Sequence, residues 1–221
     1  MTRDFPESYL PLCQRLGLDR GIPWTPNWTA AADFLELLVD ELEARRPAVI
    51  LECGSGLSTL VLARGCEMLG AGRVVSLEQE AACAEGTRKA LAAYGLEARA
   101  EVLDAPLVEW RLGGESWPWY DLDRVECRGI GLLVVDGPPG RLRPLARYPA
   151  LPLLAPRLEK EWVLLLDDAA RDEERAVVAR WCEQWPGLRH CYLPLERGCS
   201  RLQGALETPE GPGAASLPGW T

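Results

Sequence analysis

Histidine and lysine are scarce in this chain of 221 residues. It has a single histidine, His190, and only two of its 24 basic residues are lysines. One histidine excludes any metal site built from several histidines. Because all the other basic residues are arginines, we attribute the bias to a GC-rich, bacterial genome and not to chemistry.

Positive charge is also in deficit. The chain has 33 acidic residues and a formal net charge of −9, so we expect no nucleic acid partner, which would need a basic face. It contains no apolar run as long as a membrane span and no basic-then-apolar leader at its start. We therefore expect a cytoplasmic protein without a membrane partner. The eight cysteines include no Cys-x-x-Cys pair, and we expect them to be reduced.

The overall composition is that of an ordinary globular protein, with 48% hydrophobic and 26% charged residues. The length suits one domain with a large core. We predict a single domain over residues 1–206, with a loosely structured lead-in at 1–28 and a flexible Pro/Gly-rich tail at 207–221. The sequence is compatible with a homodimer but leaves the oligomeric state open.

Short apolar runs alternate with helical patterns along most of the chain. The predicted strands are 48–51, 73–77, 98–103, 131–135 and 162–166, followed by a hairpin of 188–195 and 199–206. The predicted helices are 29–46, capped by Thr29, and 59–69, 79–94 and 169–185. We expect a loop with a short helix at 105–128 and a proline-interrupted helical segment at 141–160.

Alternation of strand and helix predicts an α/β fold, a doubly wound parallel sheet with helices on both faces. The closing hairpin adds an antiparallel edge. In such a sheet, ligands bind outside the carboxyl ends of the strands. The residues that end each predicted strand are therefore the candidates for function.

Acidic residues follow each of the first five predicted strands. Acids also cap helices, and one or two of them would need no other explanation. Five strand ends in succession favour a functional site instead. The acids are Glu52, Glu78, Asp104, Asp136 and the pair Asp167 and Asp168.

The first of these strands runs into a glycine-containing turn, Glu52-Cys53-Gly54-Ser55-Gly56-Leu57-Ser58-Thr59. A nicotinamide-binding fingerprint would need a third glycine where Thr59 stands. Glu52 would also repel a pyrophosphate, whereas it suits a ligand that carries an amino group and a sulfonium.

These motifs resemble those of class I S-adenosylmethionine-dependent methyltransferases. Residues 52–59 resemble the first motif, in a variant with Ser-Thr in place of the third glycine, and residues 134–140 resemble the fourth motif. The resemblance implies a Rossmann-like seven-stranded sheet of order 3-2-1-4-5-7-6 and S-adenosylmethionine as cofactor. It implies that the ribose is held by Glu78 and the adenine amino group by Asp104. The expected cofactor-binding residues are Glu52, Gly54, Ser55, Gly56, Ser58, Thr59, Glu78, Asp104 and Asp136.

The carboxylates after the fourth and fifth strands allow two interpretations. Asp136, Asp167 and Asp168 are similar to the ligands of metal-dependent O-methyltransferases, which implies Mg²⁺ or another divalent cation beside the acceptor. Alternatively, Asp167 or Asp168 caps the following helix and Asp136 works without metal. A lysine base of that branch is missing, because Pro139 stands in its place. We therefore take Asp136 and Asp168 as the catalytic candidates.

The resemblance implies transfer of a methyl group, for which we expect a hydroxyl of a small molecule or sugar as acceptor. The alternatives are a Rossmann-like enzyme that binds NAD(P) or another nucleotide, and a cofactor-binding module without catalytic activity. Two further groups either line the acceptor site or have ordinary structural roles. They are the aromatic residues Trp24, Trp28, Trp117, Trp119 and Tyr120, and the group Arg141, Arg143, Arg147 and Tyr148.

Overall fold

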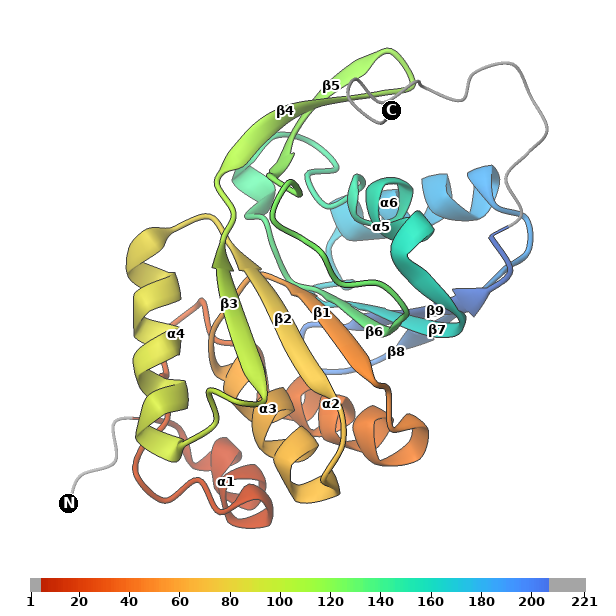
Figure 1. The fold of residues 1–221 in the computed structure, drawn as a ribbon. Helices are drawn as coiled ribbons and strands as arrows, with labels where there is room; N and C mark the ends of the chain where they lie inside the picture. The colour runs from red at the N-terminus through yellow and green to blue at the C-terminus, as the bar shows by residue number, and fades with distance from the viewer. Residues whose placement is uncertain (1–4, 207–221) are drawn as a thin grey trace.

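A central seven-stranded sheet organises the computed structural model, which describes residues 5–206 (Figure 1). Its strand order is β3-β2-β1-β6-β7-β9-β8. Numbered within this sheet alone, the order is 3-2-1-4-5-7-6, which confirms the predicted topology. The strands are β1 Val49–Cys53, β2 Arg73–Glu78, β3 Ala100–Asp104, β6 Ile130–Val135, β7 Leu158–Leu166, β8 Leu188–Leu193 and β9 Cys199–Gly204.

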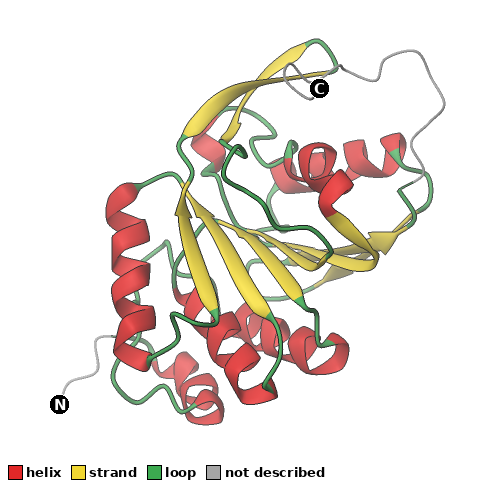
Figure 2. Cartoon of the chain, viewed as in Figure 1, coloured by secondary structure: helices red, strands yellow, loops and turns green. Residues whose placement is uncertain are grey.

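Helices cover both faces of this sheet (Figure 2). One layer holds α1 Leu10–Leu16, α2 Ala32–Arg45, α3 Leu57–Leu69 and α4 Ala81–Tyr94, and the other holds α5 Ala150–Leu154 and α6 Asp172–Gln184. Short 3₁₀ turns occupy Glu7–Tyr9, Gly140–Leu142 and Ala155–Arg157. The strands β3, β2, β1, β6 and β7 pair in parallel, and β9 is antiparallel to both of its neighbours, β7 and β8.

The parallel strands are buried on both faces, so their side chains feed two separate cores. In β6, Leu132 and Val134 pack with the layer of α1 to α4, whereas Leu133 and Val135 pack with α5 and α6. Continuous apolar runs such as residues 130–135 therefore fit this fold, since neither face of these strands meets water. Because these strands are parallel, their carboxyl ends lie together at one edge of the sheet.

Residues 105–128 differ from the prediction of a loop with a short helix. They contain a two-stranded antiparallel hairpin, β4 Leu107–Leu112 and β5 Glu115–Tyr120, which extends from the body in Figure 1. Gly113 and Gly114 connect the strands with φ values of 58° and 83°. Two adjacent residues at positive φ are the signature of a tight hairpin turn, so the Gly-Gly pair was the overlooked signal.

The hairpin is anchored to the body by its aromatic residues. Trp117 and Trp119 are fully buried in the core that contains α5 and α6, so the packing alternative holds for both. Trp117 lies against Tyr148, with ring centroids 4.7 Å apart. The guanidinium of Arg143 covers the outer side of Trp117, at 3.5 Å from the ring centroid. Arg180 of α6 lies 4.1 Å from the Tyr148 centroid.

Ion pairs join the tip of the hairpin to the same layer. Arg180 lies 2.7 Å from Glu115, and Arg143 lies 3.4 Å from the same carboxylate. The aromatic contacts and the ion pairs together connect β5, α6 and the loop that follows β6.

Three predicted boundaries were wrong for local reasons. The helix expected from Thr29 begins at Ala32, because the Thr29 hydroxyl accepts a hydrogen bond from the Thr25 amide at 2.7 Å. The helix expected from Ala169 begins at Asp172, since the amides of Ala169 and Ala170 donate to carbonyl groups of 197–198. In the segment 141–160, α-helix is confined to Ala150–Leu154, with 3₁₀ turns at Gly140–Leu142 and Ala155–Arg157, and β7 extends back to Leu158.

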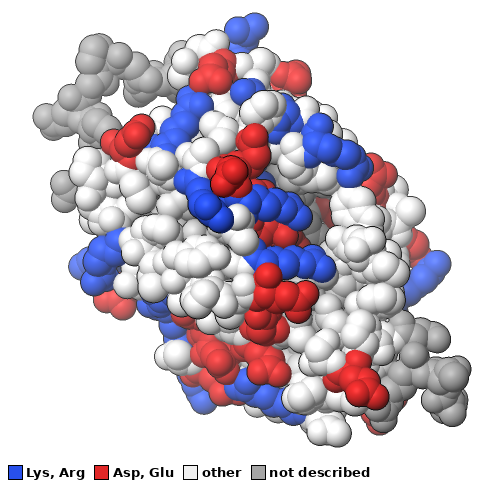
Figure 3. Space-filling model, turned by 180° about the vertical axis from the view of Figure 1, so that it is seen from behind, with Lys and Arg blue, Asp and Glu red and all other residues white. Residues whose placement is uncertain are grey.

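Charged side chains of both signs are interspersed on the face seen in Figure 3. No helix among residues 5–206 is both long and apolar enough to cross a membrane. The tail predicted at 207–221 lies outside the described residues.

Replacing Trp117 by alanine is expected to destabilise the protein by about 3–5 kcal/mol, because a buried indole is lost and a cavity remains. Urea denaturation measures this change. Trp28 is 60% exposed, and Trp28→Ala is the matched control with an expected change within about 0.5 kcal/mol. Equal effects of the two variants would contradict the assignment of Trp117 to the core.

Candidate active site

The turn after β1 is held in place by hydrogen bonds that link Glu52, Gly56 and Thr59. Glu52 is fully buried, and its Oε2 accepts a hydrogen bond from the Thr59 hydroxyl at 2.5 Å. The Thr59 oxygen in turn accepts from the Gly56 amide at 3.0 Å. These two contacts hold the turn against the first residues of α3. Thr59, which stands where the third glycine of a nicotinamide-binding fingerprint would be, therefore stabilises the turn.

Glu78, at the end of β2, reaches across to the same turn. Its Oε2 accepts hydrogen bonds from the amide and the hydroxyl of Ser55, at 2.9 and 3.1 Å. Its Oε1 accepts from the Glu80 amide at 2.9 Å. The structure thus brings Glu52, Glu78 and the turn together, as the sequence predicted.

Asp104 stands beside Glu78 at the sheet edge, since the two residues are register partners of β3 and β2. Its side chain is 52% exposed, and its Oδ1 lies 2.8 Å from an amino group of Arg88. Arg88 also donates to the Val102 carbonyl, which holds the guanidinium on the β3 side. Ser58, another predicted cofactor residue, is buried at the start of α3.

The turns after β1 and β6 approach each other closely. The Cys53 carbonyl accepts hydrogen bonds from the amides of Asp136 and Gly137, at 3.1 and 2.7 Å. Gly54 has φ of 96°, which suits glycine, and a Cβ there would lie 3.3 Å from the Gly137 amide. A Cβ on Gly137 would lie 2.2 Å from the Tyr120 hydroxyl. Glycine at position 54 therefore lets the two turns approach each other, and glycine at position 137 leaves room for the Tyr120 hydroxyl.

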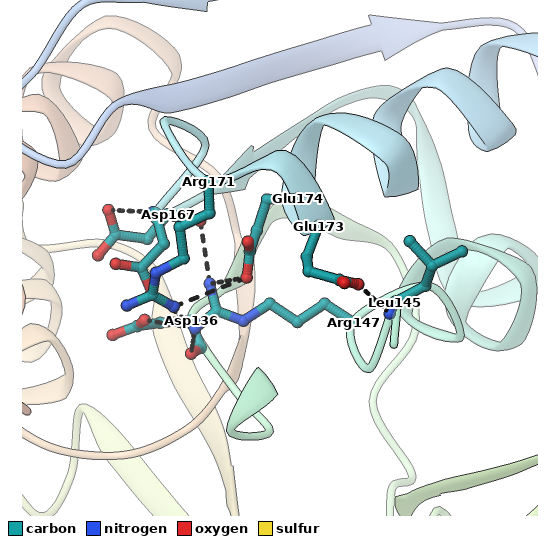
Figure 4. Close-up of polar contacts among 8 residues, drawn as sticks. Asp136, Leu145, Arg147, Asp167, Arg171, Glu173 and Glu174 are labelled. Carbon is teal, nitrogen blue, oxygen red and sulfur yellow. Dashed lines mark hydrogen bonds and ion pairs between the residues drawn. The ribbon is translucent and has the colours of Figure 1, made fainter. Parts of the chain in front are cut away.

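Four acidic residues lie close to one guanidinium at the ends of β6 and β7 (Figure 4). Asp136 follows β6, Asp167 and Asp168 follow β7, and Glu174 lies in the first turn of α6. Arg147 extends between them from the segment before α5 and is only 4% exposed.

The Arg147 guanidinium contacts most of this cluster directly. One terminal nitrogen lies 2.9 Å from Asp168 Oδ2 and 3.2 Å from Asp136 Oδ1. The other donates to the Asp167 carbonyl at 2.9 Å and lies 3.7 Å from Glu174 Oε1. The Asp136 carbonyl accepts a further hydrogen bond from the first of these nitrogens, the one that contacts Asp168. Arg171, which is 54% exposed, lies 2.8 Å from Asp168 Oδ2.

Neither aspartate after β7 caps the next helix. Asp168 has φ of 60°, and its backbone turns away from the strand before α6 begins. Asp167 Oδ1 accepts from the Asp168 amide at 2.8 Å. The remaining oxygens of both side chains are buried without a hydrogen-bond partner. The helix-cap explanation for this pair is therefore wrong.

Burial sets the protonation of these acids. It raises the pKa of Glu52 to about 7, although hydrogen bonds from Ser58, Thr59 and Ser76 act in the opposite direction. Burial also raises the pKa of Asp136 and, more strongly, that of Asp167. The positive charge of Arg147 acts in the opposite direction on the pKa of both groups.

The carboxylates do not fit a divalent-ion site as they stand. Oxygens of Asp136 and Asp168 that would face an ion contact Arg147 instead. Within residues 5–206, no group of three or more histidine, cysteine or acidic side chains has an arrangement that would hold a metal ion. Asp136, Asp167 and Asp168 do come together, but around a guanidinium.

Arg147 is the site residue that the sequence identified least well. It was one of several arginines after the fourth strand for which a surface position was an equal alternative, and the structure buries it. The proline-interrupted segment has no regular period that would indicate its direction. Two other candidates for the acceptor site, Trp28 and Arg141, are exposed and contact each other, with 5.1 Å between the guanidinium and the ring centroid.

Comparison with known proteins agrees with this architecture. A family model described as a methyltransferase domain matches residues 51–169, more than half of the chain. Among curated proteins no match was found.

Solved structures share the fold at low sequence identity. A methyltransferase from Podospora anserina with bound S-adenosylhomocysteine has a TM-score of 0.64 at 16% identity, over 91% of this chain and 89% of its own. An O-methyltransferase from Bacillus cereus in complex with the same compound has a TM-score of 0.62 at 17% identity, over 91% and 92%. A putative O-methyltransferase from Klebsiella pneumoniae has a TM-score of 0.62 at 19% identity, over 90% of each chain.

The family match and the strand order remove the alternative of a nicotinamide-dependent enzyme. The acidic carboxyl edge, with its turn after β1, lies within the matched residues. The chain therefore belongs to the methyltransferase-domain family and is a class I S-adenosylmethionine-dependent methyltransferase.

Proposed function

We propose that this enzyme methylates a hydroxyl group of a small molecule or sugar, and that Asp136 accepts the hydroxyl proton. The observation that carries the proposal is the position of Asp136. It follows β6 beside the turn after β1, and its amide donates to the Cys53 carbonyl of that turn. Several structural neighbours are described as O-methyltransferases, which supports a hydroxyl acceptor.

The cofactor is proposed to lie along the edge formed by the turn after β1 and the ends of β2 and β3. Glu78 supplies a carboxylate for the ribose hydroxyls, and Asp104 beside it supplies one for the adenine amino group. Gly54, Ser55 and Gly56 present backbone to the amino-acid portion, with Ser58 and Thr59 at the start of α3 behind them.

S-adenosylmethionine, held by the residues named above, would supply a methyl group activated by a positively charged sulfur for transfer to an acceptor oxygen. The protein has to align the acceptor and remove its proton. Asp136 is half-buried and 24% of its side chain is exposed, whereas Asp168 has only 6% exposed. Asp136 Oδ1 faces Arg147, and Asp136 Oδ2 has no hydrogen-bond partner among the described residues. Asp136 is thus the acid that can meet an acceptor.

Asp168 was a catalytic candidate, and we now propose a supporting role for it. Its side chain is buried and held by both Arg147 and Arg171. A divalent ion was the other part of the hypothesis, and no step is assigned to one because the carboxylates do not fit it.

Replacing Glu78 by alanine is expected to weaken S-adenosylhomocysteine binding roughly 10- to 100-fold, because two charge-assisted hydrogen bonds to the ribose are lost. Isothermal titration calorimetry measures the affinity. Glu80→Ala is the matched control, since Glu80 is the exposed acid two residues later. Wild-type protein that binds neither this product nor S-adenosylmethionine would disprove the proposed site.

Binding of S-adenosylmethionine is expected to tighten as the pH rises from 6 to 8. The free protein holds the Glu52 carboxyl with a pKa of about 7, and a cationic ligand beside it favours the ionised form. The deprotonated protein therefore binds better, by up to roughly tenfold per pH unit below the pKa. Glu52→Gln is expected to remove this part of the pH dependence in calorimetric titrations. Identical pH profiles for the variant and the wild type would place Glu52 away from the ligand.

Asp136→Asn is expected to lower methyl transfer roughly 10²- to 10⁴-fold while leaving cofactor binding within a few-fold. The assay uses S-adenosylmethionine with a labelled methyl group and a panel of hydroxyl-bearing small molecules and sugars. Transfer only to nitrogen or carbon acceptors would contradict the proposed substrate class. Full activity of the asparagine variant would exclude Asp136 as the base.

A further inference from the structure

We propose that Arg147 is the resident cation of the acceptor site, in the position where the three aspartates would otherwise gather a divalent metal ion. It is a positioning residue that holds Asp136 toward the acceptor. The role of Asp136 as the base rests on the function proposed above, whereas the exclusion of a metal ion by Arg147 does not.

The cluster needs a positive charge in its centre. Asp167, Asp168 and Glu174 are each more than nine-tenths buried, and Asp136 adjoins them. Carboxylates that lie this close together in a protein interior cannot all be ionised unless a cation is between them. Two classes of cation meet this need, a metal ion with oxygen ligands and a basic side chain.

Arg147 supplies that charge at the junction of the two strands. Its guanidinium binds the backbone carbonyls of Asp136 and Asp167, so it is fixed to the ends of both β6 and β7. It also contacts the side chains of Asp136 and Asp168. The same four groups define the place that a metal ion between these strands would take.

The guanidinium leaves no room for a second cation at that place. It is 4% exposed, and Asp168 Oδ2 is shared between it and Arg171. A metal ion would have to displace a cation that is fixed through backbone carbonyls, or bind next to its positive charge. The unpartnered oxygens of Asp167, Asp168 and Glu174 are buried around Arg147, so the ligands for an ion would become available only if Arg147 were removed.

The geometry also requires arginine and not lysine. A planar guanidinium with several fixed donors reaches two carbonyls and two carboxylates at once, whereas an ammonium is a single point of charge. Arg147 therefore fixes both the position and the direction of the Asp136 side chain.

Binding of Mn²⁺ tests the proposal, because electron paramagnetic resonance distinguishes free from bound Mn²⁺. The titration uses the full chain with S-adenosylhomocysteine present. The wild type is expected to bind no stoichiometric Mn²⁺ up to millimolar concentration and to keep its melting temperature with equimolar Mg²⁺. Arg147→Met is expected to gain one Mn²⁺ site, which Asp168→Asn in the same chain removes.

Arg157→Met is the matched control. Arg157 is a partly buried arginine that contacts the Val125 and Cys127 carbonyls and no carboxylate, so its loss should create no Mn²⁺ site. Arg147→Lys keeps a positive charge and should also bind no Mn²⁺.

Two results would overturn the proposal. One is a wild-type protein that binds one Mn²⁺ at micromolar concentration and loses it in Asp168→Asn. The other is a folded Arg147→Met variant that gains no site. If Arg147→Met does not fold, the wild-type titration with its Asp168→Asn counterpart still decides. None of these outcomes depends on the acceptor, so the proposed function is tested separately.

Discussion

The carbonyl group of Cys53 joins the two halves of the active edge. It ends the central strand β1 and accepts hydrogen bonds from two successive amides of the turn after β6. β1 pairs in parallel with both β2 and β6, so its end fixes where the ends of its neighbours stand. The proposed cofactor side, with Glu78, and the proposed acceptor side, with Asp136, are thereby held at one distance from each other. The glycines at 54 and 137 are needed because this junction leaves no space for side chains.

The acidic residues on the two sides of that junction have different kinds of partner. On the cofactor side, Glu78 is satisfied by neutral amides and a hydroxyl, and Asp104 is the only acid there with an arginine partner. These bonds can be shared with or exchanged for those of a ligand. On the acceptor side, buried acids are tied to a buried arginine, and such a network cannot rearrange without exposing uncompensated charge. The cofactor side thus suits reversible binding, and the acceptor side suits fixed geometry.

The sheet topology and the row of acidic residues at the strand ends could be predicted from the sequence, because both follow from local patterns. Apolar runs such as 130–135 mark buried parallel strands, and a residue that follows such a run must lie at the carboxyl edge. The hairpin at 107–120 was missed because Trp117 and Trp119 were interpreted as loop residues, although Gly113-Gly114 stands between them and the strand at 107–112.

The acceptor side was less predictable, because its contacts are between segments distant in the chain. Arg147 acts through carbonyls of residues 136 and 167, and nothing near it in the sequence indicates that neighbourhood. The start of α6 was misplaced since Asp168 adopts a left-handed backbone that its type does not require. Loop residues of this kind are determined by tertiary contacts.

The stacking of Arg143 on Trp117 has a mechanical consequence. Arg143 lies within the loop that carries Asp136 at one end and Arg147 at the other, while Trp117 belongs to the hairpin. Arg180 and Glu115 brace the same contact from α6. A displacement of the hairpin would therefore be transmitted to the loop that carries Asp136 and Arg147. The hairpin and the loop after β6 are thus coupled through one stacked pair of side chains, Arg143 and Trp117.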